Sequence, residues 1–119
     1  MIRTVHRVAL LLATVAAAAL VVLPATATTQ KTIVTVKATN ALKFILSTKT
    51  PKAGVVVFKV TNTGSIPHDF KIAGKKTPLI AGHKTATLTV TLKKGKKYPY
   101  LCTVPGHAAA GMKGVVTAK

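Results

Sequence analysis

Acidic side chains are almost missing from this sequence, since Asp69 is the only Asp or Glu among 119 residues. Most glycoside hydrolases need a pair of carboxyl groups. Calcium sites and two-metal phosphoryl-transfer sites need several carboxylates. A chain with one acid can assemble none of these sites, so these classes of protein are excluded.

Arginine is absent after Arg7, and aromatic side chains are few. The other 16 of the 18 basic residues are lysines, and without Arg3 and Arg7 the formal net charge of +17 becomes +15. Nucleic-acid recognition relies on arginine forks and stacking aromatics, so we expect no nucleic-acid partner. The scattered lysines indicate a solvated surface, or attraction to redox proteins with acidic docking surfaces or to an anionic membrane face.

The first 27 residues have the pattern of an export signal. A basic start is followed by Val8 to Leu23 without charge, and then by the small residues of Pro24 to Ala27. This pattern predicts a signal peptide over 1–27, formed as a helix, and a single mature domain over 28–119. Sixteen helical residues span about 24 Å at about 1.5 Å each, less than a bilayer core of about 30 Å. We expect a periplasmic or extracellular protein, which stays membrane-anchored if the signal is not cleaved.

Cysteine occurs once, at Cys102, so the domain can close no internal disulfide. Small secreted domains often depend on disulfides. A single thiol in an oxidising compartment is a liability unless something occupies it. Metal ligation would occupy the thiol, and the odd cysteine therefore favours a metal site.

Strand-like segments fill the chain after Lys31. β-Branched or alternating patterns predict strands over 32–37, 42–46, 55–61, 68–73, 85–92, 97–102 and 114–118, with turns or loops over 49–54, 62–65, 74–84 and 93–96. Short strands separated by frequent turns are typical of a two-sheet sandwich. The predicted fold class is therefore all-β, a two-sheet antiparallel Greek-key sandwich preceded by the signal helix.

One stretch near the C-terminus carries the chemistry. Cys102, His107 and Met112 follow a Cys-x4-His-x4-Met spacing, and His68 lies upstream beside Pro67. A thiolate, two imidazoles and a weak axial thioether are the ligand set of a blue-copper electron-transfer site. Taken singly, each residue has an ordinary interpretation: a buried cysteine, a core methionine or a loop histidine. Their combination with the lone thiol and the strand pattern favours copper.

The loop chemistry explains how these side chains can meet. Val104 to His107 matches a type II turn, with Pro105 and Gly106 in its two central positions. The alanines after His107 favour one helical turn, which Gly111 can end. Cys102 at a strand end and Met112 before the next strand then lie at the same end of the sandwich. His83 has no matching partners and is predicted to be an exposed loop residue.

The motifs resemble those of the cupredoxins, the small blue-copper proteins that include plastocyanin, azurin and auracyanin. The resemblance rests on His68-Asp69-Phe70 and on Tyr100 through Gly114. The ligand-loop spacing is similar to that of auracyanin-type proteins and longer than that of plant plastocyanins. The resemblance implies one type 1 copper per chain, held by His68, Cys102, His107 and Met112. It also implies that the backbone around Asp69 hydrogen-bonds the cysteine sulfur, although Asp69 could instead cap a turn.

The resulting expectation is a monomeric protein that carries single electrons between larger redox partners and is not an enzyme. Small and apolar residues around His107, from Val104 to Gly111 with Ile66 and Pro67, would form an uncharged contact patch. A copper binding or delivery protein would use the same ligands and exchange metal instead of electrons. A polycationic surface-binding module with a degenerate copper site is the third interpretation.

Overall fold

The computed structural model describes residues 12–23 and 30–119. Residues 12–23 are exposed and have no regular secondary structure, so the predicted signal helix is not formed in this described part. An isolated helix is marginal in water unless another surface covers its apolar side. The remainder of the predicted signal, residues 1–11 and 24–27, lies outside the described residues. Within the described part of the chain, no helix is long and apolar enough to cross a membrane.

The domain is built from short strands. The described residues form eight of them: β1 (Thr32–Ala38), β2 (Phe44–Leu46), β3 (Gly54–Asn62), β4 (Lys71–Ile72), β5 (Lys75–Lys76), β6 (Thr85–Leu92), β7 (Lys97–Leu101) and β8 (Lys113–Thr117). In β1 and β6 exposed residues alternate with buried apolar ones, as expected for strands with one face on the core.

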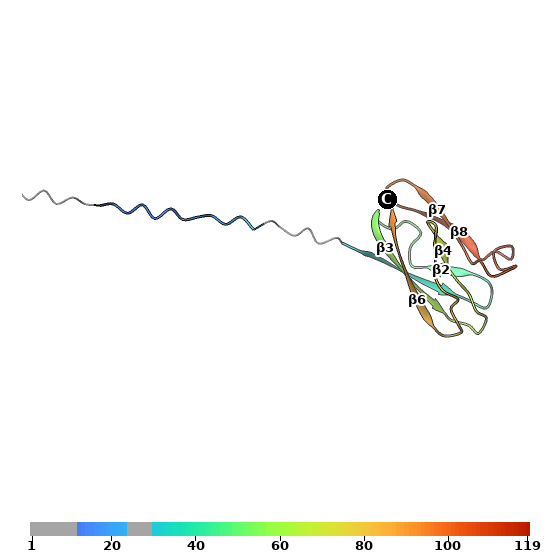
Figure 1. The fold of residues 1–119 in the computed structure, drawn as a ribbon. Helices are drawn as coiled ribbons and strands as arrows, with labels where there is room; N and C mark the ends of the chain where they lie inside the picture. The colour runs from blue at the N-terminus through green and yellow to red at the C-terminus, as the bar shows by residue number, and fades with distance from the viewer. Residues whose placement is uncertain (1–11, 24–29) are drawn as a thin grey trace, which may run out of the picture.

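The strands form two four-stranded sheets, in the orders β2-β1-β3-β6 and β5-β4-β7-β8 (Figure 1). Every strand pair is antiparallel except β1 and β3, which run parallel from Thr32 opposite Val56 to Ala38 opposite Asn62. The two-sheet sandwich predicted from the sequence is confirmed. The parallel pair arises because β2 and the segment after it return the chain to the end at which β1 began.

One hydrophobic core lies between the sheets. Val34, Val36, Val56 and Val60 of the first sheet are buried, as are Ile72, Tyr98, Tyr100 and Val116 of the second. Aromatic rings cross the interface. Phe70 lies 5.2 Å from both Phe44 and Phe58 and 5.6 Å from Tyr100, measured between ring centroids. Both tyrosines are buried, so their rings belong to this core.

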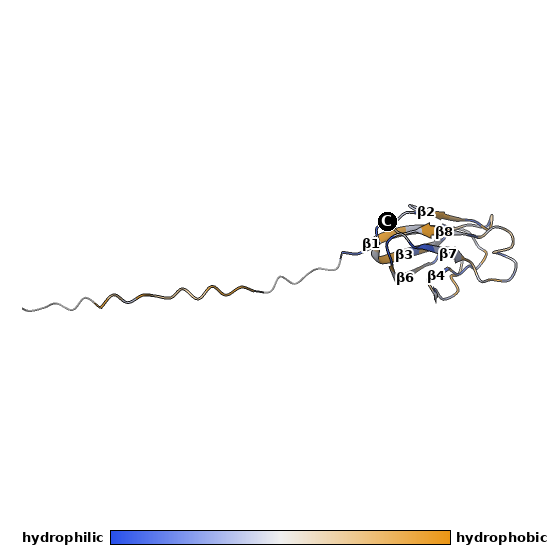
Figure 2. Cartoon of the chain, turned by 90° about the horizontal axis from the view of Figure 1, so that it is seen from above, coloured by the Kyte–Doolittle hydropathy of each residue, from blue (hydrophilic) through white to orange (hydrophobic). Residues whose placement is uncertain are grey.

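The sandwich has two distinct ends. β3 and β7 both finish at one of them, here called the loop end, which carries the loops 63–70 and 102–112. β3 begins at the other end, opposite the last residue of β6, and the turn 93–96 connects β6 to β7 there. The first residues of β1 and the carboxyl terminus also lie at this second end, away from the long loops (Figure 2).

Two local predictions differ from the structure. The strand expected over 68–73 is reduced to β4, with a separate bridge between His68 and Ile80. The ladder is interrupted because the Phe70 N–H donates to the Thr77 hydroxyl, 3.0 Å away, while Asp69 turns toward another loop. Lys75 and Lys76, expected in a turn, form β5 against β4.

Candidate metal centre

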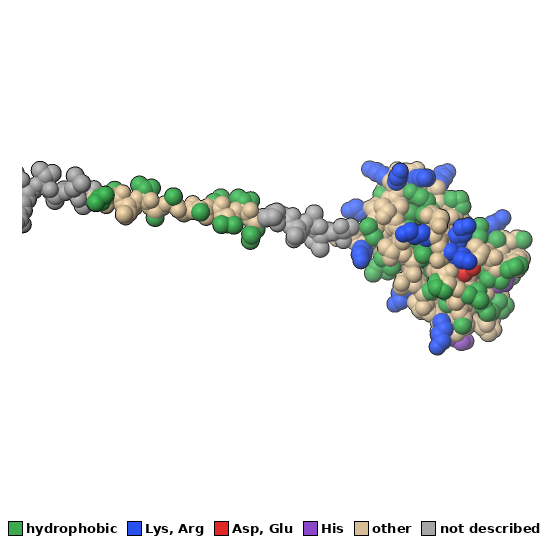
Figure 3. All heavy atoms as spheres, in the orientation of Figure 1, with side chains coloured by type: hydrophobic (Ala, Val, Ile, Leu, Met, Phe, Trp, Pro, Cys, Tyr) green, Lys and Arg blue, Asp and Glu red, His purple; other side chains and the backbone are tan. Residues whose placement is uncertain are grey.

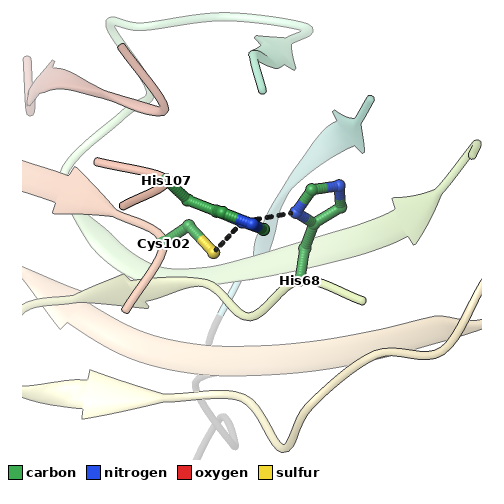
Figure 4. Close-up of side chains that lie close together, drawn as sticks. All are labelled: His68, Cys102 and His107. Carbon is green, nitrogen blue, oxygen red and sulfur yellow. Dashed lines mark hydrogen bonds between the residues drawn. The ribbon is translucent and has the colours of Figure 1, made fainter. Parts of the chain in front are cut away.

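Three of the four predicted ligands meet at the loop end. His68 precedes β4, Cys102 follows β7, and His107 lies in the loop between β7 and β8. Their ligand atoms all lie within 4.8 Å of one another. The His107 Nδ1 atom is 3.2 Å from Nδ1 of His68 and 3.5 Å from Sγ of Cys102. Figure 4 shows the His107 ring reaching between the other two side chains.

The spacing of these three atoms fits one first-row transition-metal ion. Nitrogen ligands lie about 2.0–2.1 Å and thiolate sulfur about 2.3 Å from zinc in proteins. Two such atoms on one ion are therefore roughly 3–4 Å apart, as the His107 contacts are here. One thiolate with two imidazoles is the trigonal set of blue-copper sites. The residues present thus fit copper.

The four predicted ligands differ in their access to solvent. The side chains of His68 and Met112 are 0% exposed and Cys102 is 1% exposed, whereas His107 is only half-buried. The exposed residues Pro105, Gly106 and Ala109 flank His107. An ion bound here is therefore shielded from water on the core side and approached through the His107 edge.

The predicted loop geometry is confirmed. The His107 N–H donates to the Val104 carbonyl over 3.1 Å, and Gly106 has a φ of 83°, as a type II turn requires. The Ala110 N–H then donates to the carbonyls of Gly106 and His107, which closes a single helical turn. Gly111 ends this turn with a φ of 110°, which favours glycine because a Cβ is disfavoured there.

Met112 is tied to two of the other ligands through its backbone. Its N–H donates to the His107 carbonyl and its carbonyl accepts the Cys102 N–H, each over 3.1 Å. The Met112 side chain is completely buried. This arrangement brings Met112 back to Cys102, as the spacing suggested, and the axial role of its sulfur stays a prediction.

His68 is held by neighbours that are distant in sequence. Its N–H donates to the Ile80 carbonyl over 3.2 Å, and its carbonyl accepts the Ile80 N–H over 2.7 Å. The Asn62 amide donates to the carbonyls of Ile66 and Ile80, at 2.7 and 3.0 Å. His68 Nε2 is buried without a hydrogen-bond partner. The ring therefore directs Nδ1, not Nε2, toward the other ligands.

Two asparagines organise the loop before His68, and sequence reasoning missed both. Asn62 is fully buried and also accepts the Gly64 N–H through Oδ1. Asn40 Oδ1 accepts the N–H groups of Ser65 and Ile66, at 2.9 and 3.1 Å. A Cβ on Gly64 would lie 1.9 Å from that same Asn40 oxygen, so a larger residue would displace the Asn40 side chain from these hydrogen bonds. The sequence signal was weak because asparagine and glycine there indicate only a turn.

The side chain of Asp69 links the His68 loop to the Cys102 loop. Its carboxylate accepts the Thr103 N–H over 2.6 Å and also the Thr103 hydroxyl. Lys76 Nζ lies 3.8 Å from the same carboxylate. Sequence reasoning had offered a backbone role or a turn cap for Asp69. The structure adds a side-chain bridge across to the residue that follows the cysteine.

Burial keeps His68 neutral and Cys102 protonated in the metal-free protein. Desolvation, with the nearby His107, lowers the pKa of His68, although the Thr39 backbone and Asp69 act in the opposite direction. Burial raises the pKa of the Cys102 thiol, and the Asp69 charge adds to this effect. The backbones of Asp69 and Val104 favour the thiolate and lower that pKa. Metal binding must therefore displace the thiol proton.

The metal-free protein is expected to lose stability at both pH extremes. Below about 6.5, the ordinary pKa of histidine, the unfolded chain gains a proton at His68 that the folded chain resists. Above about 9.0, the unfolded chain loses the Cys102 proton while the folded chain keeps it. Urea unfolding at a series of pH values measures how the free energy of unfolding changes at the acidic and at the alkaline end. Cys102→Ser should remove the loss of stability above about pH 9. If the variant lost stability there as steeply as the wild type, the assignment to Cys102 would be wrong.

Among the described histidines, one lies outside this cluster. His83 is exposed in the loop 81–84, with a φ of 62°, as the sequence had suggested for a loop residue. His6 was assigned to the signal segment and lies outside the described residues.

Similarity to solved structures agrees with this geometry. Auracyanin A from Chloroflexus aurantiacus, described as a blue copper protein, superposes with a TM-score of 0.64 at 21% identity, covering 76% of this chain and 100% of its own. Dithionite-reduced auracyanin from Roseiflexus castenholzii gives a TM-score of 0.63 at 20% identity, covering 77% of this chain and 99% of its own. Rusticyanin from Thiobacillus ferrooxidans gives a TM-score of 0.61 at 22% identity, covering 77% of this chain and 79% of its own. At these identities the likeness establishes the fold.

The sequence itself matches a known family. A search of curated proteins found no sequence that matches this chain. The profile of the copper-binding proteins of the plastocyanin/azurin family, however, matches residues 25–119, well over half of the chain. Together with the cluster of His68, Cys102 and His107, this match means that the chain belongs to the plastocyanin/azurin family, a cupredoxin with copper as its cofactor and electron transfer as its general function.

Proposed function

We propose that this protein carries single electrons between larger redox partners outside the cytoplasm, and that it is not an enzyme. The observation that carries the proposal is the meeting of His68, Cys102 and His107 in a buried centre with one half-exposed edge. The pattern of residues 1–27 supports export to the periplasm or the extracellular space. If the segment is retained, the domain stays attached to the membrane.

The ligands divide their roles by chemistry. Copper alternates between Cu(II) and Cu(I) in such sites and so accepts or releases one electron. The Cys102 thiolate would supply the strongest bond to copper, and His68 and His107 would hold the ion with it. The hydrogen bonds that hold His68 to Ile80 and Met112 to Cys102 and His107 fix these positions before metal binds. A preorganised set rearranges little when the charge changes, which keeps the barrier to electron transfer low.

Electrons are proposed to leave through the edge of His107. The other three residues of the centre are buried, and only His107 reaches the surface. Pro105 and Ala109, which flank it in the loop, are exposed, and Ile66, in the loop that leads to His68, is 38% exposed. An apolar patch of this kind is typical of a contact surface. Lys43 and Lys113, exposed at the same end, suit a redox partner with an acidic docking surface.

Voltammetry with copper-chelator exchange tests the proposed function. An electron carrier is expected to show a reversible one-electron couple and to keep its copper against a Cu(I) chelator over many redox cycles. A copper delivery protein would use the same ligands but would release the metal to the chelator on reduction. Rapid loss of copper, with no reversible couple, would contradict electron transfer and favour delivery.

Replacing Met112 with glutamine should retain copper and lower its reduction potential. The expected direction follows because an oxygen ligand favours Cu(II) more than a thioether does. Potentiometric titration of Met112→Gln measures the shift. The sequence contains one other methionine, Met1, so no alternative thioether is available within residues 28–119. Loss of copper, or an unchanged potential, would argue against Met112 as the axial ligand.

An acidic residue in the apolar patch should slow exchange with the partner. Ala109→Asp places a charge beside His107 and should lower the bimolecular electron-transfer rate about tenfold, since a desolvated like charge at an acidic interface is repelled. Thr89→Asp is the matched control, because Thr89 is exposed on β6 away from the centre. Stopped-flow kinetics measures both rates. Equal slowing in the two variants would contradict docking at His107.

A further inference from the structure

Half of the lysines lie at the end of the sandwich opposite the metal centre. The fold gathers eight of the 16 there, all exposed and here called the basic end: Lys31, Lys49, Lys52, Lys93, Lys94, Lys96, Lys97 and Lys119. Lysine side chains gather in the space-filling view at the upper end of the domain, where β3 begins and β6 ends (Figure 3). In the sequence these lysines are spread over almost 90 positions, so the fold creates the patch.

Backbone hydrogen bonds tie three segments of the basic end together. In the turn between β6 and β7, the Lys96 N–H donates to the Lys93 carbonyl over 3.1 Å. This turn is joined to the last residues of the chain, because the Gly95 N–H donates to the Ala118 carbonyl and the Ala118 N–H to the Lys96 carbonyl. The charges of Lys93 to Lys97 are therefore displayed on a fixed frame.

The remaining lysines are joined to the same frame. The Lys119 N–H donates to the Pro51 carbonyl over 3.0 Å, and the Lys49 carbonyl accepts the Thr117 N–H over 2.9 Å. Lys31 and Lys52 line one shallow hollow of about 380 Å³, which lies where the chain enters β1. Together these contacts make the basic end one continuous surface.

No carboxylate side chain compensates this charge. The only acid in the sequence is Asp69, which lies at the loop end and is bound to Thr103. The ion pair formed within the described residues joins Asp69 to Lys76, which is outside the basic end. The eight lysines therefore repel one another, and a surface of opposite charge would relieve that repulsion.

A redox partner at His107 does not account for these lysines. β3 has nine residues and runs from one end of the sandwich to the other, a length of about 30 Å at roughly 3.3 Å per residue. The Debye length is about 8 Å at physiological ionic strength. Charges at the basic end are thus several Debye lengths from a partner docked at the loop end, and their attraction to it is screened.

We propose that the basic end binds the anionic surface of a lipid bilayer and so holds the copper centre facing away from the membrane. Lysines attract anionic headgroups through charge alone and need no shaped pocket. A protein partner is less suited, since protein interfaces are depleted of lysine and enriched in aromatic and arginine side chains. The chain also enters β1 at this end, and in the sequence eight residues separate β1 from the apolar run Val8 to Leu23. This orientation leaves the His107 patch free for redox partners.

Vesicle partitioning of the copper-loaded full chain tests this proposal independently of electron transfer. The protein should bind phosphatidylcholine vesicles that contain roughly one-third phosphatidylglycerol much more tightly than pure phosphatidylcholine vesicles, and this difference should fade in high salt. Each lysine near such a surface contributes about fivefold to partitioning. The combined variant Lys93→Gln, Lys94→Gln, Lys96→Gln and Lys97→Gln should therefore bind the anionic vesicles at least about 50-fold more weakly.

A control variant with the same net charge separates the basic end from charge in general. Lys37→Gln, Lys59→Gln, Lys71→Gln and Lys84→Gln removes four exposed lysines outside the basic end and should weaken binding less than about fivefold. The visible copper spectrum confirms that both variants are folded. Equal weakening in the two variants would overturn the proposal, as would equal binding of wild type to neutral and anionic vesicles. Neither result would bear on electron transfer at the copper.

Discussion

Replacing Cys102 with serine is expected to abolish intense visible absorption of the copper complex and to eliminate electron transfer. The thiolate provides the strong, covalent bond that gives a type 1 site its colour. Loss of a residue that merely supports a ligand lowers metal affinity about 10–100-fold, and loss of the thiolate itself should exceed that range. Visible spectroscopy and competition with a chelator measure the two effects.

The matched control for this change is His83→Gln, which alters an exposed residue outside the cluster and should leave colour and affinity unchanged. Serine is close to cysteine in size, so Cys102→Ser should fold, and urea unfolding of the metal-free proteins checks this. If the serine variant kept the intense band, Cys102 could not be the ligand and the assignment of the centre would be wrong.

Removal of the Asp69 carboxylate is expected to destabilise the copper-free protein, although Asp69 is not one of the predicted metal ligands. Asp69→Ala leaves the N–H and hydroxyl of Thr103 without their acceptor and separates the two ligand-bearing loops. Lost hydrogen bonds to a charged group should lower the free energy of unfolding by about 2–3 kcal/mol. Denaturant unfolding of the copper-free protein measures this loss.

Two further variants separate the effect of the Asp69–Thr103 hydrogen bonds from the effect of the Asp69 charge. Thr103→Val removes one arm of the bridge, so in a double-mutant cycle with Asp69→Ala the losses should be clearly non-additive. Asp69→Asn removes the charge while keeping an oxygen for the Thr103 N–H. Because a negative charge near the centre stabilises Cu(II) more than Cu(I), its loss should raise the reduction potential, on the order of 50 mV. Additive losses and an unchanged potential would contradict the role assigned to Asp69.

The strands and the ligand loop were predictable because their signals are local. The alternation of threonine with apolar residues marked Thr85–Leu92 with the bounds that the structure has. Pro105 and Gly106 indicated the turn that brings His107 toward Cys102, and the structure has this turn. Residue types that are rare in this chain, one cysteine and one internal methionine, made the ligand set visible.

The supporting contacts were not predictable, because their partners are far apart in sequence. Asn40 binds the backbone at Ser65 and Ile66, and Asp69 binds Thr103, across 34 positions. No periodicity or turn motif connects such pairs. The strand over 68–73 was overpredicted for the same reason, since hydrogen bonds to the side chains of Asp69 and Thr77 replace the ladder.

The clustering of the lysines results from the fold and could not be predicted from the sequence pattern. The lysines appear scattered along the chain, yet strand directions place Lys31 and Lys52 at the same end as Lys93 and Lys119. Only the order of strands in the two sheets determines which of them become neighbours.

The most direct test of the copper centre is a visible absorption spectrum of the purified protein during titration with Cu(II). The ligands predict an intense thiolate-to-copper band that grows in proportion to added metal and saturates at one copper per chain. Such a band would establish a type 1 copper site with Cys102, the only cysteine of the chain, as its thiolate ligand. A pale complex, or binding that does not saturate, would contradict the proposed electron carrier.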